Sequence, residues 1–253
     1  MRLTFIILAA ALPSCSQVRT QLTDTPINSI VLTSVRSMPK GCGYDASQAA
    51  VDRLASSVSL KNGIIKQDLK AAKSTFCSGA TYLVFLRTIE QLRLGNSTFL
   101  PESKYTRFAD LRVKDGEEIF GRWNANGPGT AKLFSDLKCG INFTSYDHAN
   151  PGDFMKMWWT NAIGKKERGH SVIYLGSHGD QILYWSANHP EGYGCKSVAK
   201  SRVKHVLFSR LTNPAKLVNA HRLAPRDSFL GDMLHKDFTW RQISQSCKIK
   251  AHP

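Results

Sequence analysis

Cys77 is the residue whose type and surroundings best fit covalent chemistry. It opens the largely apolar segment 77–92, which predicts a buried helix, and Ser74 or Thr75 can cap that helix. The thiol therefore falls in the first turn, where the helix dipole and unpaired backbone N–H groups favour a thiolate. A structural cysteine in a core helix is the alternative interpretation.

A nucleophilic thiol needs a base, and the base needs an orienting group. Of the eight histidines, His170 follows Gly169 and opens a β-branched, aromatic run that predicts a buried strand. Asn188 and Ser186 lie two apart near the end of the next predicted strand, so they share one face of it. Asn188, or Ser186 as second choice, can bind one imidazole nitrogen and aim the other at Cys77.

These residues must be positioned by the elements around them, and helical patterns precede strand patterns along the chain. A helix is predicted after Asp45 as N-cap, a buried helix over 77–92 and a short helix over 130–137. Strands are predicted over 154–159, 170–176, 181–188 and 203–211, with a less ordered C-terminal segment. Helices followed by an antiparallel sheet indicate the α+β class.

The stretches STFCSGATYLVFL, ANPGDF, GHSVIYLG and YWSAN, within residues 74 to 190, resemble the papain-like cell-wall hydrolases of the CHAP and NlpC type. The resemblance implies a papain-like α+β fold, in which a buried N-terminal helix carrying the cysteine packs on an antiparallel sheet. It implies Cys77 as nucleophile, His170 as general base and Asn188 as orienting residue, without a cofactor. The family's substrates are amide bonds in peptidoglycan peptides.

Other residues are candidates for substrate contact. Small side chains after the thiol let a carbonyl approach backbone N–H groups that can form an oxyanion hole. The loop GRWNANGPG, at 121–129, has no counterpart in the family pattern and can form a lid or substrate wall. The oxyanion or substrate-binding candidates are Ser78, Gly79, Trp123, Asn124, Asn126 and Trp158.

The N-terminus has the order of an export signal: Arg2, a short apolar run and then small residues. Residues 1–16 are expected to be a signal peptide, with Cys15 either lipidated as in a bacterial lipobox or removed. Residues 17–40 are expected to be a tether, and residues 41–253 a single hydrolase domain with an insertion at about 93–148. The protein is then periplasmic, envelope-anchored or extracellular.

Export bears on the remaining cysteines, because an oxidising compartment permits disulfides. Setting Cys15 aside leaves five, so two disulfides among Cys42, Cys139, Cys195 and Cys247 would leave Cys77 unpaired. The alternative is that all five remain reduced. No CxxC, HxH or HExxH spacing is present, so no metal is expected.

Charge narrows the class of partner. Lys and Arg number 34 against 19 Asp and Glu, a net charge of +15, and hydrophobic residues make up 42% of the chain. This composition excludes a disordered tail and a membrane bundle, and the charge favours an anionic partner. Without a nucleic-acid-binding motif, peptidoglycan or another anionic envelope polymer is expected, with membrane anchoring through Cys15 as a further contact.

The sequence leaves three functions open. The first is a cysteine peptidase or amidase that transfers an acyl group to water. The second uses the same fold as an acyltransferase or transpeptidase with an amine acceptor. The third is a non-catalytic basic protein of the cell envelope in which Cys77 is buried and inert. The oligomeric state is not indicated by the sequence.

Overall fold

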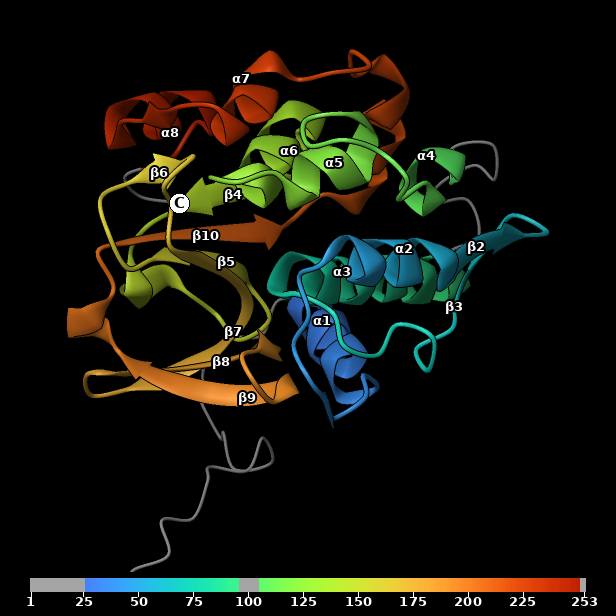
Figure 1. Ribbon diagram of the computed structural model, residues 1–253, viewed down its shortest axis with the longest axis horizontal. Helices are drawn as coiled ribbons and strands as arrows, with labels where there is room; N and C mark the ends of the chain where they lie inside the picture. The colour runs from blue at the N-terminus through green and yellow to red at the C-terminus, as the bar shows by residue number, and fades with distance from the viewer. Residues whose placement is uncertain (1–25, 96–104, 251–253) are drawn as a thin grey trace, which may run out of the picture.

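The computed structural model describes residues 26–95 and 105–250 of the chain, arranged around a seven-stranded antiparallel sheet (Figure 1). The strand order is β1-β9-β8-β7-β5-β10-β4. These strands are β1 (Gly41–Cys42), β4 (Gly140–Phe143), β5 (Phe154–Trp158), β7 (Gly169–His178), β8 (Gln181–Asn188), β9 (Gly192–Ala199) and β10 (His205–Leu211). Two small sheets pair β2 (Val58–Lys61) with β3 (Ile64–Gln67) and β6 (Ile163–Gly164) with β11 (Asp237–Phe238).

The α-helices of the described residues come before β4 or after β10 in the sequence. The α-helices are α1 (Pro26–Arg36), α2 (Gln48–Ser56), α3 (Cys77–Gly95), α4 (Thr106–Ala109), α5 (Glu118–Asn124), α6 (Gly129–Leu137), α7 (Ser228–Gly231) and α8 (Trp240–Ser246). Short 3₁₀ helices are η3 (Tyr146–His148), η4 (Lys200–Arg202), η5 (Pro214–Arg222) and η6 (Asp232–Leu234). The α+β class is confirmed. In the described part of the chain, no helix has the length and apolar character needed to cross a bilayer.

Helix α3 is the buried helix that its all-round apolar sequence predicts. Every residue from Ser78 to Leu86 is buried, and the helix packs on β7 and β8. The Phe85 ring, which is fully buried, stacks on Trp123 at a centroid distance of 4.8 Å and meets Phe154 edge-on at 6.1 Å. Aromatic rings from α3, α5, α6 and β5 thus form one core that fixes the helix against the sheet.

The predicted strands and helices before residue 212 are largely present. Strand β8 covers the predicted 181–188, and β5, β7 and β10 fall within or close to their predicted segments. Helix α2 begins later than expected, because Ser47 caps it by accepting from the Ala50 N–H at 3.3 Å. The Asp45 carboxylate instead accepts from the Ser47 N–H at 2.8 Å and pairs with Arg53.

Part of the predicted tether is a packed helix. Residues 26–36 form α1, whose Val31 and Val35 are buried against α3. Residues 17–25 of the predicted tether lie outside the described residues. Ile27, Val31 and Val35 are four apart, which is helical spacing, but Ser and Thr between them dilute the pattern. The expected signal peptide, including Cys15, also lies outside the described residues.

Asp153 ties α1 to the sheet at the start of β5. Its carboxylate is fully buried and accepts from Asn28 Nδ2 at 2.9 Å, from the Asn150 N–H at 2.8 Å and from two nitrogens of Arg210 at 2.8 and 2.7 Å. A buried carboxylate is tolerated when it is paired and fully hydrogen-bonded. The Pro-Gly-Asp turn is therefore a structural anchor that sets where β5 begins.

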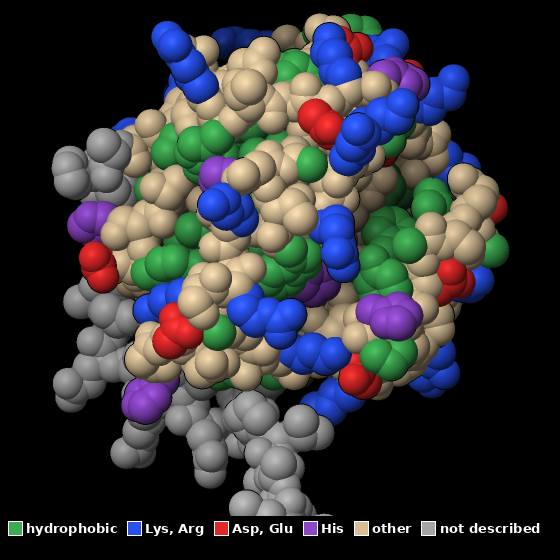
Figure 2. Space-filling view, turned by 60° about the vertical axis from the view of Figure 1, so that its left-hand side comes forward, with side chains coloured by type: hydrophobic (Ala, Val, Ile, Leu, Met, Phe, Trp, Pro, Cys, Tyr) green, Lys and Arg blue, Asp and Glu red, His purple; other side chains and the backbone are tan. Residues whose placement is uncertain are grey.

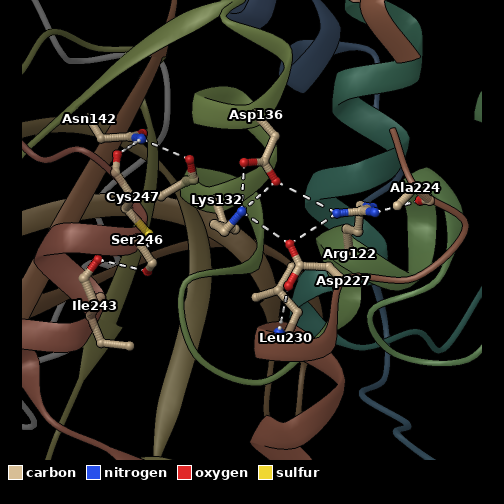
Figure 3. A network of polar contacts seen from close by, with 11 residues as sticks. Arg122, Lys132, Asp136, Asn142, Ala224, Asp227, Leu230, Ile243, Ser246 and Cys247 are labelled. Atoms are coloured by element: carbon tan, nitrogen blue, oxygen red, sulfur yellow. Dashed lines mark hydrogen bonds and ion pairs between the residues drawn. The ribbon is translucent and has the colours of Figure 1, made fainter. Parts of the chain in front are cut away.

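The C-terminal segment is ordered, against expectation, by ion pairs with α5 and α6 (Figure 3). The buried Arg122 guanidinium lies 3.0 Å from Asp227, and Lys132 contacts Asp227 at 3.1 Å and Asp136 at 2.6 Å. Asn142 Nδ2 adds a hydrogen bond to the Cys247 carbonyl at 2.8 Å.

The segment predicted as an insertion, at about 93–148, is packed into the domain where the structure describes it. Its helices α5 and α6 contribute side chains to the central core. Residues 96–104 of this segment lie outside the described residues.

Phe85→Ala should test how far the fold depends on the α3 core. Loss of the ring should lower the free energy of unfolding by about 3–5 kcal/mol, because it removes buried area and leaves a cavity. Urea denaturation followed by circular dichroism measures the change. Leu94→Ala in the same helix is the matched control: Leu94 is 76% exposed, and its loss should cost less than about 0.5 kcal/mol. Equal effects of the two variants would contradict the packing described.

Candidate active site

The structure brings Cys77, His170 and Asn188 together. His170 Nε2 lies 3.0 Å from Asn188 Oδ1, and the imidazole hydrogen-bonds the Cys77 sulfur. Asn188 Nδ2 donates to the carbonyls of Ser186 at 3.2 Å and Gly194 at 2.8 Å, so its oxygen is the atom left to face the imidazole. Nε2 therefore carries a hydrogen, and Nδ1 is the nitrogen that faces the thiol.

The three residues come from elements that the fold places side by side. Cys77 begins α3, His170 is the second residue of β7, and Asn188 ends β8, the antiparallel neighbour of β7. The Ser171 N–H of β7 also hydrogen-bonds the Cys77 sulfur. The sequence predicted the helix start and both strands, and their packing is what closes the triad.

The surroundings of Cys77 favour its ionised form. Packing around the sulfur raises the thiol pKa, but the hydrogen bond and charge of His170, the charge of Lys156 and the Ser171 N–H together outweigh it. The net result is a pKa lowered to about 6. Cys77 is nevertheless partly exposed, so the thiolate is open to a substrate.

Lys156 supplies the second cation and is held in place by Glu167. Its Nζ lies 2.8 Å from Glu167 Oε1, and the Glu167 side chain is only 6% exposed. Glu167 Oε2 also accepts from the Gly127 N–H at 2.6 Å and from Trp158 Nε1 at 3.0 Å. Burial alone would lower the pKa of Lys156, but the charges of Glu167 and Cys77 raise it by more than burial lowers it. The pKa is therefore above its ordinary value, and the ammonium stays protonated.

Tyr44 covers the thiol from a different part of the chain. Its hydroxyl hydrogen-bonds Cys77, and burial and the nearby Cys77 charge raise its pKa, so the phenol keeps its proton. The ring meets His189 edge-on at 5.8 Å. A phenol that remains protonated can donate to the thiolate or to an oxygen of a bound substrate.

The thiol opens into a cleft of about 330 Å³. One wall is a hydrogen-bonded chain in which Ser78 Oγ donates to Asn124 Oδ1 at 2.8 Å and Asn124 Nδ2 donates to Asp115 at 2.9 Å. Burial raises the pKa of Asp115, which forms no ion pair among the described residues. Asp115 and Asn124 also line a groove of about 600 Å³ beside α2, so the cleft and this groove share one wall.

Some of the predicted substrate contacts line the cleft and others do not. Ser78, Asn124 and Asn126 line the cleft. Gly79 does not: a Cβ there would lie 2.8 Å from both Leu54 Cδ2 and Thr75 Oγ1, so Gly79 allows α3 to pack closely.

Three further side chains are placed away from substrate. Trp123 and Trp158 are 2% and 0% exposed, so neither ring is open to a ligand. Ser186 is fully buried and donates to the Ser171 carbonyl at 2.7 Å, which leaves Asn188 as the residue that orients His170.

The predicted helix caps differ as well. Ser74 has a positive φ of 53° and donates to the Cys42 carbonyl instead of capping α3. Thr75 Oγ1 is buried without a hydrogen-bond partner among the described residues. The first-turn N–H groups of α3 are thus not capped by either side chain.

Sequence reasoning missed Tyr44, Asp115, Lys156 and Glu167 as site residues. A signal existed for one of them: Lys156 is the single charge in the strand FMKMW, where a lone cation in an apolar strand indicates a buried partner. Tyr44 and Asp115 lie in irregular segments far from Cys77 in sequence, and no local pattern distinguishes them.

Three other described cysteines lie outside the triad. Cys42, Cys139 and Cys247 are free thiols, so the structure does not contain the two disulfides that the sequence favoured. Burial raises the pKa of Cys139 well above its usual range and that of Cys247 to about 12. In contrast to Cys139 and Cys247, Cys77 has a lowered pKa.

Comparisons with known proteins do not assign the chain to a family. The chain matches no family model, and no curated protein or solved structure shows significant similarity to it. Among the residues that the structure describes, no group of three or more His, Cys, Asp or Glu side chains is placed to hold a metal ion.

Alkylation of Cys77 by iodoacetamide should depend on pH with a midpoint near 6, because only the thiolate reacts. Below this pH the thiol is protonated and labelling slows; above it the rate reaches a plateau. In His170→Ala the midpoint should move above about 8, toward or beyond that of a free cysteine. Peptide mapping by mass spectrometry identifies the labelled residue. Labelling of Cys77 that is unchanged in His170→Ala would show that the pair is not coupled.

Lys156→Met should also raise the midpoint of Cys77 labelling, but by less than His170→Ala, because Lys156 acts through charge alone. Lys156→Arg keeps the charge and should retain most of the lowered pKa. The matched control is Lys216→Met, which removes an exposed lysine of η5 and should leave the midpoint unchanged. A midpoint in Lys156→Met equal to that of the wild type would remove Lys156 from the site.

Proposed function

We propose that this protein is a cysteine hydrolase that cleaves amide bonds. The observation that carries the proposal is the hydrogen-bonded series Cys77, His170 and Asn188, with the thiol pKa lowered to about 6. A poised thiolate, a base and a residue that orients the base are the parts of a nucleophilic acyl-transfer site. The buried and inert cysteine of the non-catalytic alternative does not fit a partly exposed thiol with a lowered pKa.

The reaction follows from these positions. The Cys77 sulfur attacks the amide carbonyl carbon, and a C–S bond forms as the carbonyl electrons move to oxygen. Nδ1 of the protonated His170 gives its proton to the leaving nitrogen, and the C–N bond breaks to release an amine. His170 then takes a proton from water, which attacks the thioester, and a carboxylic acid leaves as the thiolate is restored.

Two features suit the transition state. Backbone N–H groups in the first turn of α3 lack intrahelical partners and can receive the carbonyl oxygen as it becomes negative. The Tyr44 hydroxyl is a further donor at the same thiol, and the Lys156 ammonium adds positive charge there. These groups are fixed by the fold before substrate binds, which is the condition for efficient stabilisation of developing charge.

The substrate class is proposed from the resemblance and from the shape of the site. The motifs of papain-like cell-wall hydrolases suggest peptide bonds of peptidoglycan, and an export signal would place the protein in the envelope. The cleft at Cys77 and the groove that shares Asp115 with it suit an extended, peptide-like chain. Asp115, which lacks a cationic partner in the described structure, suits a substrate that carries an amine.

Purified peptidoglycan peptides incubated with the protein should yield new amino and carboxyl termini, detected by liquid chromatography and mass spectrometry. Cys77→Ala should abolish the products, and His170→Ala should lower the rate by about 10²- to 10⁴-fold. Cys42→Ser, which alters a thiol outside the triad, is the control and should remain active. A rate that survives Cys77→Ala would overturn the mechanism. Products that incorporate an added amine would favour an acyltransferase.

A further inference from the structure

A second hollow of about 520 Å³ lies beside the candidate active site, and its lining shares no residue with the Cys77 cleft. It is formed where the end of β5, the approach to β7, strands β8 and β9, and η4 come together. Its size falls within the range of small-molecule sites. The side chains that give it chemical character are Trp159, Thr160, Arg168, Tyr184, Ser197 and Arg202.

The charge of this hollow is positive. Arg168 and Arg202 both line it, and in the described part of the chain neither guanidinium forms an ion pair with a carboxylate. An arginine presents a planar fork of N–H donors that matches a carboxylate or a phosphate. On the face of the molecule shown in Figure 2, Lys and Arg side chains are more prominent than Asp and Glu side chains. The hollow therefore suits an anionic group.

The remaining lining favours a ring that bears hydroxyl groups. Trp159 is partly exposed, unlike its buried neighbour Trp158, and Tyr184 is buried beside it, so the hollow has an aromatic wall. Thr160 Oγ1 is buried without a hydrogen-bond partner among the described residues, and Ser197 adds a second hydroxyl. A buried polar atom without a partner costs free energy unless a ligand or water satisfies it.

We propose that this hollow is a binding site for an acidic sugar, that is, a hydroxylated ring carrying a carboxylate. The two arginines bind the carboxylate, the aromatic wall packs against the face of the ring, and Thr160 and Ser197 bond its hydroxyl groups. A neutral sugar would leave both guanidinium groups unpaired. An inorganic anion would leave the aromatic wall and the hydroxyls unused.

The site goes beyond the proposed hydrolase activity and does not rest on it, because binding there requires no thiol chemistry. The two sites are nevertheless adjacent: Arg168 lines the hollow, Gly169 lines the cleft, and the Tyr184 ring meets the His170 ring edge-on at 5.7 Å. A polymer of acidic sugars bound in the hollow would therefore lie next to the cleft, because consecutive residues line the two sites.

Isothermal titration of the full chain with glucuronate tests the proposal, with glucose, inorganic phosphate and adenosine monophosphate as comparison probes. Glucuronate should bind saturably and at least tenfold more tightly than the other three. The double variant Arg168→Gln/Arg202→Gln should weaken glucuronate at least tenfold, and Trp159→Ala should also weaken it. Arg36→Gln, at an exposed position on α1, is the matched control and should bind like the wild type.

Thermal unfolding of each variant checks that the fold is retained, and Cys77→Ala, which should bind like the wild type, separates this test from that of the hydrolase. Three results would overturn the proposal: equal binding of glucose, tighter binding of phosphate or the nucleotide, and unchanged glucuronate affinity in the double arginine variant. The first would indicate a site that ignores charge. The second would indicate a phosphate site or a nucleotide site.

Discussion

An ionised sulfur inside a protein must be compensated by nearby positive charge and hydrogen-bond donors, and the arrangement around Cys77 meets this requirement. Crowding by protein atoms alone would raise the thiol pKa, so the lowered value depends on His170 and Lys156 reaching the same point. They come from β7 and β5, which are adjacent in the sheet, with His170 opposite Met157 and Lys156 opposite Ser171 in the register. The strand order therefore matters chemically as well as structurally.

Glu167 extends this requirement into the walls of the cleft. It neutralises Lys156 and at the same time accepts hydrogen bonds from Gly127, Gly164 and Trp158, which belong to the loop before α6, to β6 and to β5. A buried ion pair adds little net stability, because desolvation offsets most of its attraction, but loss of one partner is costly. The value of the Lys156–Glu167 pair thus lies in fixing where the ammonium stands and in holding three segments of the wall around it.

The sequence predicted those parts of the fold that local patterns specify. The all-round apolar composition of α3 and the β-branched runs of β7 and β8 identified the elements that carry Cys77, His170 and Asn188. Ordering of the C-terminal segment was not predictable, because it depends on Arg122 and Lys132 meeting Asp227, about a hundred residues away. Tyr44 reaches Cys77 for the same kind of reason, through tertiary packing that leaves no periodic trace. Trp123 and Asn124 show that the orientation of individual side chains is harder to predict than the elements. Trp123 is buried in the core and Asn124 lines the cleft, but both were predicted from the loop sequence as substrate contacts.

Gly169 shows how a correct motif can have an unexpected physical reason. In the sequence, Gly169 directly precedes His170 at the start of the predicted strand. In the structure a Cβ at this position would lie 2.8 Å from Lys156 Cε and 3.2 Å from Glu167 Oε1, while its backbone needs no left-handed conformation. Any larger residue would displace the lysine side chain from beside the thiol. Both residues of the Gly-His pair therefore contribute to the lowered pKa of Cys77. His170 acts on the thiol directly, and Gly169 leaves room for the Lys156 side chain to lie beside it.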